Sequence, residues 1–331
     1  MIRYGLAFLL SFVFASCWTP LMRRAAEQLG IVDSPDGKLK KHGIAVPYFG
    51  GLAIYIGFLL TLGVFTDFGT ETLGLLLSGT IALMVGLIDD FGVLSPAQKL
   101  LGQTLAALVL IKSGTYIKLS YLPLWVAIPL SVLWILAVTN ALNIIDILDG
   151  LASGVAAIAA FSIAIANYTA GREPIAFLCI VLCGGILGFL RYNFYPAKIY
   201  LGDAGSLFIG FMLASLSMNA GYTRTNLLAV ASPVFILGIP LFDLALVMWI
   251  RWRNGMPVTK GSPDHFALRL RRCRLSVRET AITTYIVGAL LSGTALLISH
   301  VSLEWAVATM CGTLSAACLL AYLLLKVDMQ S

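Results

Sequence analysis

The chain has 331 residues, of which 59% are hydrophobic and only 11% are charged, and its mean hydropathy is +0.92. A soluble domain of this length needs much more charged surface, so these values exclude an ordinary soluble protein and indicate one integral membrane domain over residues 1–331. The net charge of +6 does not predict a nucleic-acid partner, because membrane proteins gather Lys and Arg in their cytoplasmic loops.

Apolar stretches of membrane-spanning length predict an all-α, polytopic fold with about eleven transmembrane helices, ten being the alternative count. They lie near residues 3–21, 50–66, 72–88, 100–117, 123–139, 151–170, 174–190, 206–220, 228–250, 281–300 and 305–325. The first stretch continues past Cys17 to Arg23 and Arg24, so we interpret it as a retained helix rather than a cleaved signal peptide.

The connections between these stretches predict the orientation. One set of connections carries 17 of the 22 Lys and Arg residues. It comprises the segments near 22–49, 89–99, 140–150, 191–205 and 251–280 and the tail after 325. The positive-inside rule places this set in the cytoplasm, with the N-terminus outside and the C-terminus inside. Two crossings separate each motif-bearing segment from the next, so distant residues are expected to meet in one cytoplasmic cleft.

The first of these loops ends with a basic pair, Lys41 and His42, shortly before Gly50 and Gly51. This arrangement predicts an anion site on the lipid side, and a basic membrane anchor is the alternative interpretation.

Asp89 and Asp90 end the third stretch. Carboxylates are disfavoured at a helix C-terminus by the helix dipole, and a metal ion or a substrate proton would relieve that penalty. Neighbouring side chains on a helix point about 100° apart, so the two are expected to have different roles. The alternative is a solvated helix end.

Polar side chains recur every third residue at Asn140, Asn143, Asp146 and Asp149. On a helix this spacing predicts one slowly turning polar stripe. Amide and carboxylate oxygens suit Mg²⁺, ribose or amides. A polar helix–helix seam is the alternative.

Gly202 and Gly205 flank Asp203 just before the next apolar stretch. Small residues let backbone N–H groups approach a phosphate, and the following helix offers its positive N-terminal end. Ser206 is predicted to cap that helix, and Asp203 is a candidate metal ligand. An ordinary capped turn is the alternative.

The loop 251–280 is strongly basic, which a positive-inside loop near anionic lipid largely explains. The segment preceding His265 predicts a helix cap, and His265 and Arg269 would then share a face suited to a pyrophosphate. Asp243 is an acid inside the apolar stretch 228–250, and such acids are commonly functional, often in a water-filled cavity.

Together these segments resemble the polyprenyl-phosphate N-acetylhexosamine-1-phosphate transferases, and the resemblance spans residues 33 to about 276. Asp89-Asp90 is similar to the paired aspartates of that superfamily, residues 140–151 to its NxxNxxDxxDGL segment, and residues 201–206 to its GDxGS segment. Two departures stand out: Ile147 replaces a frequent glycine, and only His265 matches a loop motif that carries several histidines.

The resemblance implies a Mg²⁺-dependent transfer of a sugar 1-phosphate, most simply GlcNAc-1-phosphate, from a UDP-sugar to undecaprenyl or another polyprenyl phosphate. Mn²⁺ is an alternative ion. The implied catalytic residues are Asp89, Asp90, Asp146 and Asp203, with Asp203, Asp90 and Asp146 as metal ligands. The implied substrate-binding residues are Asn140, Asn143, Asp149, His265, Arg269, Lys41, His42, Gly202, Gly205 and Ser206.

The resemblance also implies a bacterial inner-membrane location, an active site on the cytoplasmic face, and homodimers as an assembly found in the superfamily. Two other functions stay open from the sequence. One is a phospho-N-acetylmuramoyl-pentapeptide transferase of peptidoglycan synthesis. The other is a cation-coupled transporter, which also uses intramembrane acids but is expected to place them nearer the middle of the membrane.

Overall fold

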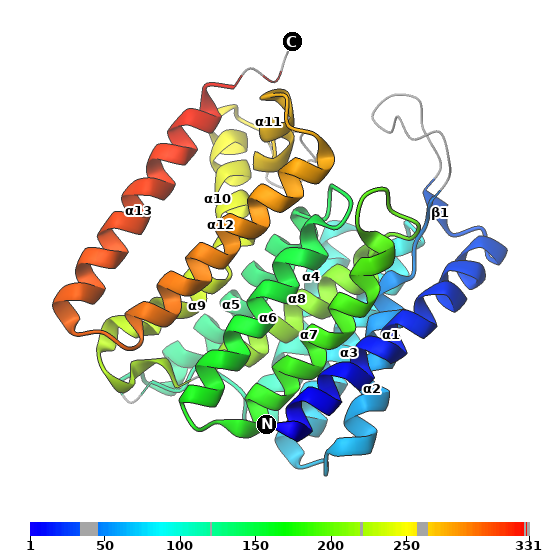
Figure 1. Cartoon of the computed structure of the whole chain (residues 1–331), viewed down its shortest axis with the longest axis horizontal. Helices are drawn as coiled ribbons and strands as arrows, with labels where there is room; N and C mark the ends of the chain where they lie inside the picture. Colours follow the sequence, from blue (N-terminus) through cyan, green and yellow to red (C-terminus); the bar gives the residue numbers. More distant parts are fainter. Residues whose placement is uncertain (34–45, 120, 219–220, 257–263, 328, 330–331) are drawn as a thin grey trace.

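The structure is a computed structural model that describes residues 1–33, 46–119, 121–218, 221–256, 264–327 and 329. Long helices lie side by side in one bundle, and the two termini lie at opposite ends of it (Figure 1). This arrangement confirms the all-α prediction. The strands in the described residues are two short ones, β1 (Val32–Asp33) and β2 (Val46–Pro47), which pair antiparallel.

Among the described residues, seven helices are long and apolar enough to cross a membrane. They are α1 (Ile2–Gln28), α3 (Thr70–Asp90), α5 (Leu124–Ile144), α6 (Leu151–Thr169), α7 (Glu173–Asn193), α12 (Val277–Ile298) and α13 (Leu303–Leu325). The chain therefore has the helices of a multi-pass membrane protein.

Shorter helices complete the bundle. They are α2 (Gly50–Phe65), α4 (Pro96–Lys112), α8 (Gly202–Met218), α9 (Ser232–Ile236), α10 (Gly238–Arg253) and α11 (Phe266–Arg272), with 3₁₀ turns at η1 (Tyr222–Arg224) and η2 (Leu227–Ala231). Helix α4 begins at a capping box, in which the Ser95 hydroxyl accepts from the Gln98 N–H and the Gln98 side chain accepts from the Ser95 N–H.

The stretch 228–250 is not the single helix that the sequence predicts. It is broken at Leu237, and the axes of Leu227–Ile236 and Gly238–Arg253 differ by 76°. Pro240 lies in the first turn of α10, where it has no N–H to donate and its ring opposes the carbonyl of Ile236. An uninterrupted helix through this point would lose a hydrogen bond and gain a clash.

Helix α8 lies at the centre of the bundle, and every residue from Ala204 to Ser217 is buried. It packs mainly against α3 and α5, with α2 and α6 around them. At the other extreme, α13 lies at the edge of the bundle (Figure 1), and only 6% of its apolar window is buried. The first turn of α8 thus presents Asp203 at one end of the most buried helix.

Candidate functional site

A lysine lies at the centre of the acidic cluster. The Lys99 ammonium donates to Asp89 Oδ2 at 2.6 Å, to Asp203 Oδ2 at 2.8 Å and to Asn143 Oδ1 at 3.0 Å. An ammonium has three N–H donors, so these contacts use its full capacity. Because α4 carries Lys99 and its three partners come from α3, α5 and α8, one cation joins the ends of four helices.

Asp90 holds the start of α8. Its Oδ1 accepts from the Asp203 N–H at 2.6 Å and its Oδ2 from the Ala204 N–H at 3.1 Å. These are helix N-terminal amides, which a carboxylate stabilises both by hydrogen bonding and through the helix dipole. Asp90 therefore caps α8 from another helix. These contacts position Asp203, and the role of Asp90 as a metal ligand stays a prediction.

One sequence expectation for the start of α8 is wrong. The helix begins at Gly202, so Asp203 lies inside its first turn and Ser206 is too far along to be its N-cap. Ser206 instead accepts from Asn143 Nδ2 at 2.8 Å. Two amides of this segment, those of Asp203 and Ala204, are bonded to Asp90, and phosphate binding by the segment stays a prediction.

Two glycines permit this close approach. A Cβ on Gly86 of α3 would lie 2.2 Å from the Asp203 carbonyl oxygen, so the two helices meet only because that Cβ is missing. Gly202 has φ +75°, and a Cβ there would lie 2.9 Å from Asp90 Oδ2. Gly205 is buried in the same first turns of α8.

The polar stripe 140–149 is only half helical, because α5 ends at Ile144 and a turn carries Asp146 and Asp149. Asn143, on the last turn, donates to Asp203 Oδ1 at 2.6 Å and to Ser206. Asn140, one turn earlier, exchanges hydrogen bonds with the buried Gln103 of α4, at 2.6 and 3.3 Å. Asn143 thus belongs to the cluster, whereas Asn140 fixes α4 against α5.

The turn after α5 brings two more carboxylates to the cluster. Burial, followed by the negative charges of Asp203, Asp90 and Asp149, raises the pKa of Asp146 to about 8. Asp149 Oδ2 accepts from the Ala197 N–H at 2.9 Å, which ties the turn to the segment before α8. The pKa of Asp146 therefore depends on the other carboxylates of the cluster, and Asp149 contacts the segment before α8.

The predicted loop residues have separate partners. His265 precedes α11, and its Nδ1 lies 2.8 Å from Asp243 Oδ2. Arg269 donates to Asp264 and to the carbonyl oxygens of Leu324 and Val327, at 2.8 to 3.1 Å. Its guanidinium therefore holds the C-terminal end of α13, a contact that does not support the predicted pyrophosphate role.

The structure thus gathers Asp89, Asp90, Asn143, Asp146 and Asp203 at one end of the bundle. Lys41 and His42 lie outside the described residues. Sequence reasoning missed Lys99, which counted only as one basic loop residue. A signal was present, because Lys99 is the one lysine in the predicted loop 89–99 that follows the Asp pair, and it comes one residue after a capping box.

Across the residues that the structure describes, no group of three or more His, Cys, Asp or Glu side chains is arranged to hold a metal ion. However, oxygens of Asp89, Asp203 and Asn143 all lie within 3.0 Å of one cationic nitrogen. Carboxylate and amide oxygens are the hard donors that Mg²⁺ prefers. The donor chemistry therefore fits a hard cation, with Lys99 occupying the point where the donors meet.

Comparisons with known proteins show the family of the chain. A probable undecaprenyl-phosphate N-acetylglucosaminyl 1-phosphate transferase of Bacillus subtilis (strain 168) is 35% identical over 314 residues, which cover 92% of this chain and 87% of the relative. The family model described as Glycosyl transferase family 4 matches residues 72–221. The chain belongs to glycosyl transferase family 4.

Other members of the family are similar over most of their length. A decaprenyl-phosphate N-acetylglucosaminephosphotransferase of Mycobacterium leprae (strain TN) is 32% identical over 293 residues, 77% of this chain and 74% of the relative. An undecaprenyl-phosphate alpha-N-acetylglucosaminyl 1-phosphate transferase of Escherichia coli (strain K12) is 25% identical over 311 residues, 89% of this chain and 84% of the relative. The matched range 72–221 includes the Asp89–Asp203 cluster and ends before His265.

Replacing Lys99 by Met removes the cation that joins the cluster while keeping a side chain of similar length. Activity is expected to fall by about a hundredfold or more, because charge-assisted contacts to two carboxylates disappear together. Turnover and thermal unfolding should be measured in the same detergent. Lys112→Met, an exposed lysine at the far end of the same helix, is the matched control. Activity within twofold of wild type in Lys99→Met would contradict this role.

Gly86→Ala leaves every carboxylate in place but puts a methyl group against the Asp203 carbonyl. Overpacking of this kind costs roughly 1–3 kcal/mol, and a displacement near 1 Å costs on the order of a hundredfold in rate. We expect a lower melting temperature and at least about a tenfold loss of activity. Gly63→Ala on α2, where the methyl meets nothing within 4 Å, should change neither. Equal behaviour of the two variants would refute the close-approach argument.

Proposed function

We propose that the protein transfers GlcNAc-1-phosphate from UDP-GlcNAc to undecaprenyl or another polyprenyl phosphate and releases UMP. The observation that carries the proposal is the cluster of hard oxygens around Lys99, at one end of an apolar helix bundle. Family members similar over most of the chain are named for this transfer. A cation-coupled transporter fits less well, because the acids gather at one end of the bundle.

The reaction brings two anions together, so neutralising their charge is the main catalytic task. In the free protein, Lys99 offsets part of the negative charge of Asp89 and Asp203. We propose Mg²⁺ as the cofactor, with Asp203 and Asp146 as its ligands and Asp89 beside them. When bound, the ion would offset the negative charge of the diphosphate. Asp90 has both oxygens on backbone amides of α8 and is left out of this ligand set.

In the proposed chemical step, an oxygen of the lipid phosphate attacks the phosphorus that bears the sugar. The bond from that phosphorus to the bridging oxygen breaks, and the oxygen leaves as part of UMP. The second pKa of a phosphate monoester is near 6, so the attacking group is largely ionised near neutral pH. We therefore favour direct attack, with Asp89 holding the Lys99 ammonium in the cluster, over a covalent intermediate on Asp89.

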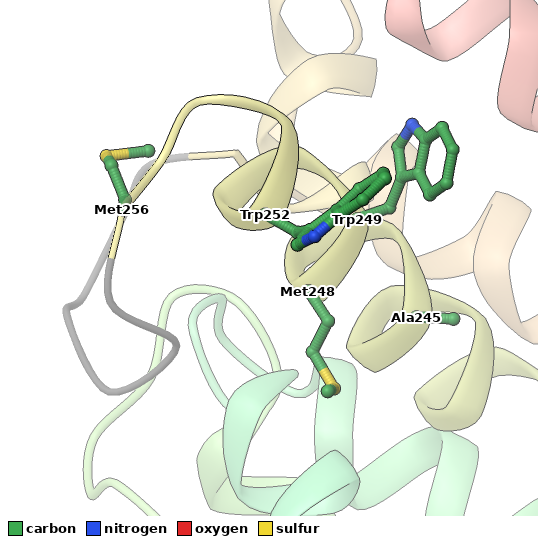
Figure 2. A pocket seen from close by; sticks show the side chains of 5 residues that line it. All are labelled: Ala245, Met248, Trp249, Trp252 and Met256. Carbon is green, nitrogen blue, oxygen red and sulfur yellow. The ribbon is translucent and has the colours of Figure 1, made fainter.

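The polyprenyl tail has a candidate site along α10. Ala245, Met248, Trp249, Trp252 and Met256 line an open apolar cavity of about 530 Å³, shown in Figure 2. The rings of Trp249 and Trp252 lie 5.2 Å apart. Flexible Met and broad aromatic side chains suit a long, irregular isoprenoid chain. Helix α10 packs on α5, whose last turn carries Asn143, so this groove lies beside a helix that leads to the cluster.

The proposed orientation places the cluster at the cytoplasmic face of a bacterial inner membrane. The described chain has seven helices long enough to cross, and the bent α9–α10 pair can form an eighth span. We propose that the shorter α2, α4 and α8 also cross, which would give eleven crossings. An odd number agrees with termini at opposite ends of the bundle (Figure 1). The excess of Lys and Arg in the alternate loops supports a cytoplasmic C-terminus.

Purified protein, UDP-GlcNAc and undecaprenyl phosphate should give UMP and a lipid-linked GlcNAc diphosphate in the presence of Mg²⁺. Asp203→Asn should lower the rate by at least about a hundredfold, because Asp203 is expected to bind the ion and contacts Lys99. Asp67→Asn, which alters an exposed carboxylate between α2 and α3, serves as the control. UDP-MurNAc-pentapeptide tests the alternative donor. Absence of product from every UDP-sugar would remove the proposal.

The raised pKa of Asp146 predicts how Mg²⁺ binding depends on pH. Below about pH 8 this carboxyl is protonated, so protons compete with the ion. Mg²⁺ affinity should therefore rise with pH, by up to about tenfold per unit, and level off above pH 8. The shift of melting temperature with Mg²⁺ concentration, recorded from pH 6.5 to 9, measures this without turnover. Asp146→Asn should flatten the dependence, and a flat profile in the wild type would exclude Asp146 as a ligand.

A further inference from the structure

Asp243 is a fully buried acid whose two oxygens both contact the loop that carries His265. It lies in the second turn of α10, just after the 76° bend. Oδ1 accepts from the Phe266 N–H and Oδ2 contacts His265 Nδ1, each at 2.8 Å. The Phe242 ring packs edge-on against Phe266, with centroids 6.5 Å apart. Burying a carboxylate is costly unless it is hydrogen-bonded, and these partners meet that need.

The contact fixes the proton on the histidine ring. An ionised carboxylate only accepts hydrogen bonds, so Nδ1 must carry a hydrogen in both the neutral and the charged imidazole. Nε2 is then the nitrogen left for another partner. His265 also precedes the first residue of α11, and Asp243 bonds that residue's N–H, so backbone and ring are held together.

The helix after this loop contacts the turn that carries Asp146 and Asp149. Helix α12 follows α11 after four residues, and its Tyr285 donates to the Gly150 carbonyl oxygen at 2.6 Å. Gly150 directly follows Asp149 at the end of the turn that also carries Asp146. The loop that Asp243 holds is therefore attached at the end of the bundle where the acidic cluster lies.

We propose that Asp243 is a positioning residue for the sugar nucleotide: it fixes the tautomer and direction of His265 so that Nε2 contacts the UDP-sugar. This inference rests on the proposed function. It differs from a purely structural role, in which Asp243 would only attach the loop to α10 and the ring would meet no substrate.

His265→Asn separates the two roles. Its amide nitrogen can replace Nδ1 and donate to Asp243, but it has no atom at the position of Nε2. We expect a melting temperature close to wild type, a KM for UDP-GlcNAc raised by about ten- to a hundredfold, as for the loss of one strong hydrogen bond, and an unchanged KM for undecaprenyl phosphate. An unchanged KM for UDP-GlcNAc would overturn the proposal.

Asp243→Asn tests the positioning step. Its amide N–H can face Nδ1, which drives the ring hydrogen to Nε2 while the Phe266 contact is kept. The KM for UDP-GlcNAc should rise, and the double variant with His265→Asn should be little worse than His265→Asn alone, because both act through Nε2. Independent, multiplying effects would contradict the pairing.

Ser232→Ala is the matched control. Ser232 is fully buried on the other side of the bend and bonds Ala295 and Ser299, so its loss affects packing without reaching the loop. Its KM values should stay at the wild-type values.

Calorimetric titration with UDP-GlcNAc gives the same comparison without turnover. Binding by the wild type without product would count against the proposed function alone, whereas equal affinity in wild type and His265→Asn, or no binding by either, would count against the role of Asp243.

Discussion

The Lys99 ammonium offsets part of the negative charge of the acids on which the site depends. Asp89, Asp203 and Asn143 come from three different helices, and their oxygens meet at Lys99. Without a cation at this point, neighbouring carboxylates at the end of an apolar bundle would repel one another, and protonation would relieve that repulsion. Because Asp89 and Asp203 carry two negative charges against the single positive charge of Lys99, the cluster has room for a further cation where two phosphate-bearing substrates would have to meet.

The sequence predicts the cluster because of a simple feature of membrane helices. Segments separated by two crossings face the same side, so the position of Asp89 relative to residues 140–149 and Asp203 along the chain already indicates a common face. Hydrophobic length likewise predicts where most helices begin and end. Both inferences use only one-dimensional patterns, which is why they hold for residues more than a hundred positions apart.

Those patterns do not predict contacts that depend on how a helix is rotated about its axis or on how deep it lies in the bundle. Asp90 and Asp89 are adjacent, yet one caps α8 and the other contacts Lys99. Ser206 is of a residue type that commonly caps helices. The residue that caps α8 is Asp90, which lies on another helix more than a hundred positions earlier, so no local rule identifies it. Arg269 has the spacing of a ligand, whereas the position of α13 gives it carbonyl partners instead. The bend at Leu237 differs from these contacts, because its cause, Pro240, lies close to it in the sequence.

The contact between Arg269 and the end of α13 has a practical consequence for handling the protein. Its guanidinium bonds the carbonyl oxygens of Leu324 and Val327, so the last helical turn is attached to the same short helix that follows His265. An affinity tag or a fluorescent reporter fused directly behind this turn would pull on that helix. A flexible spacer of several residues, or a fusion at the opposite terminus, would leave the attachment undisturbed.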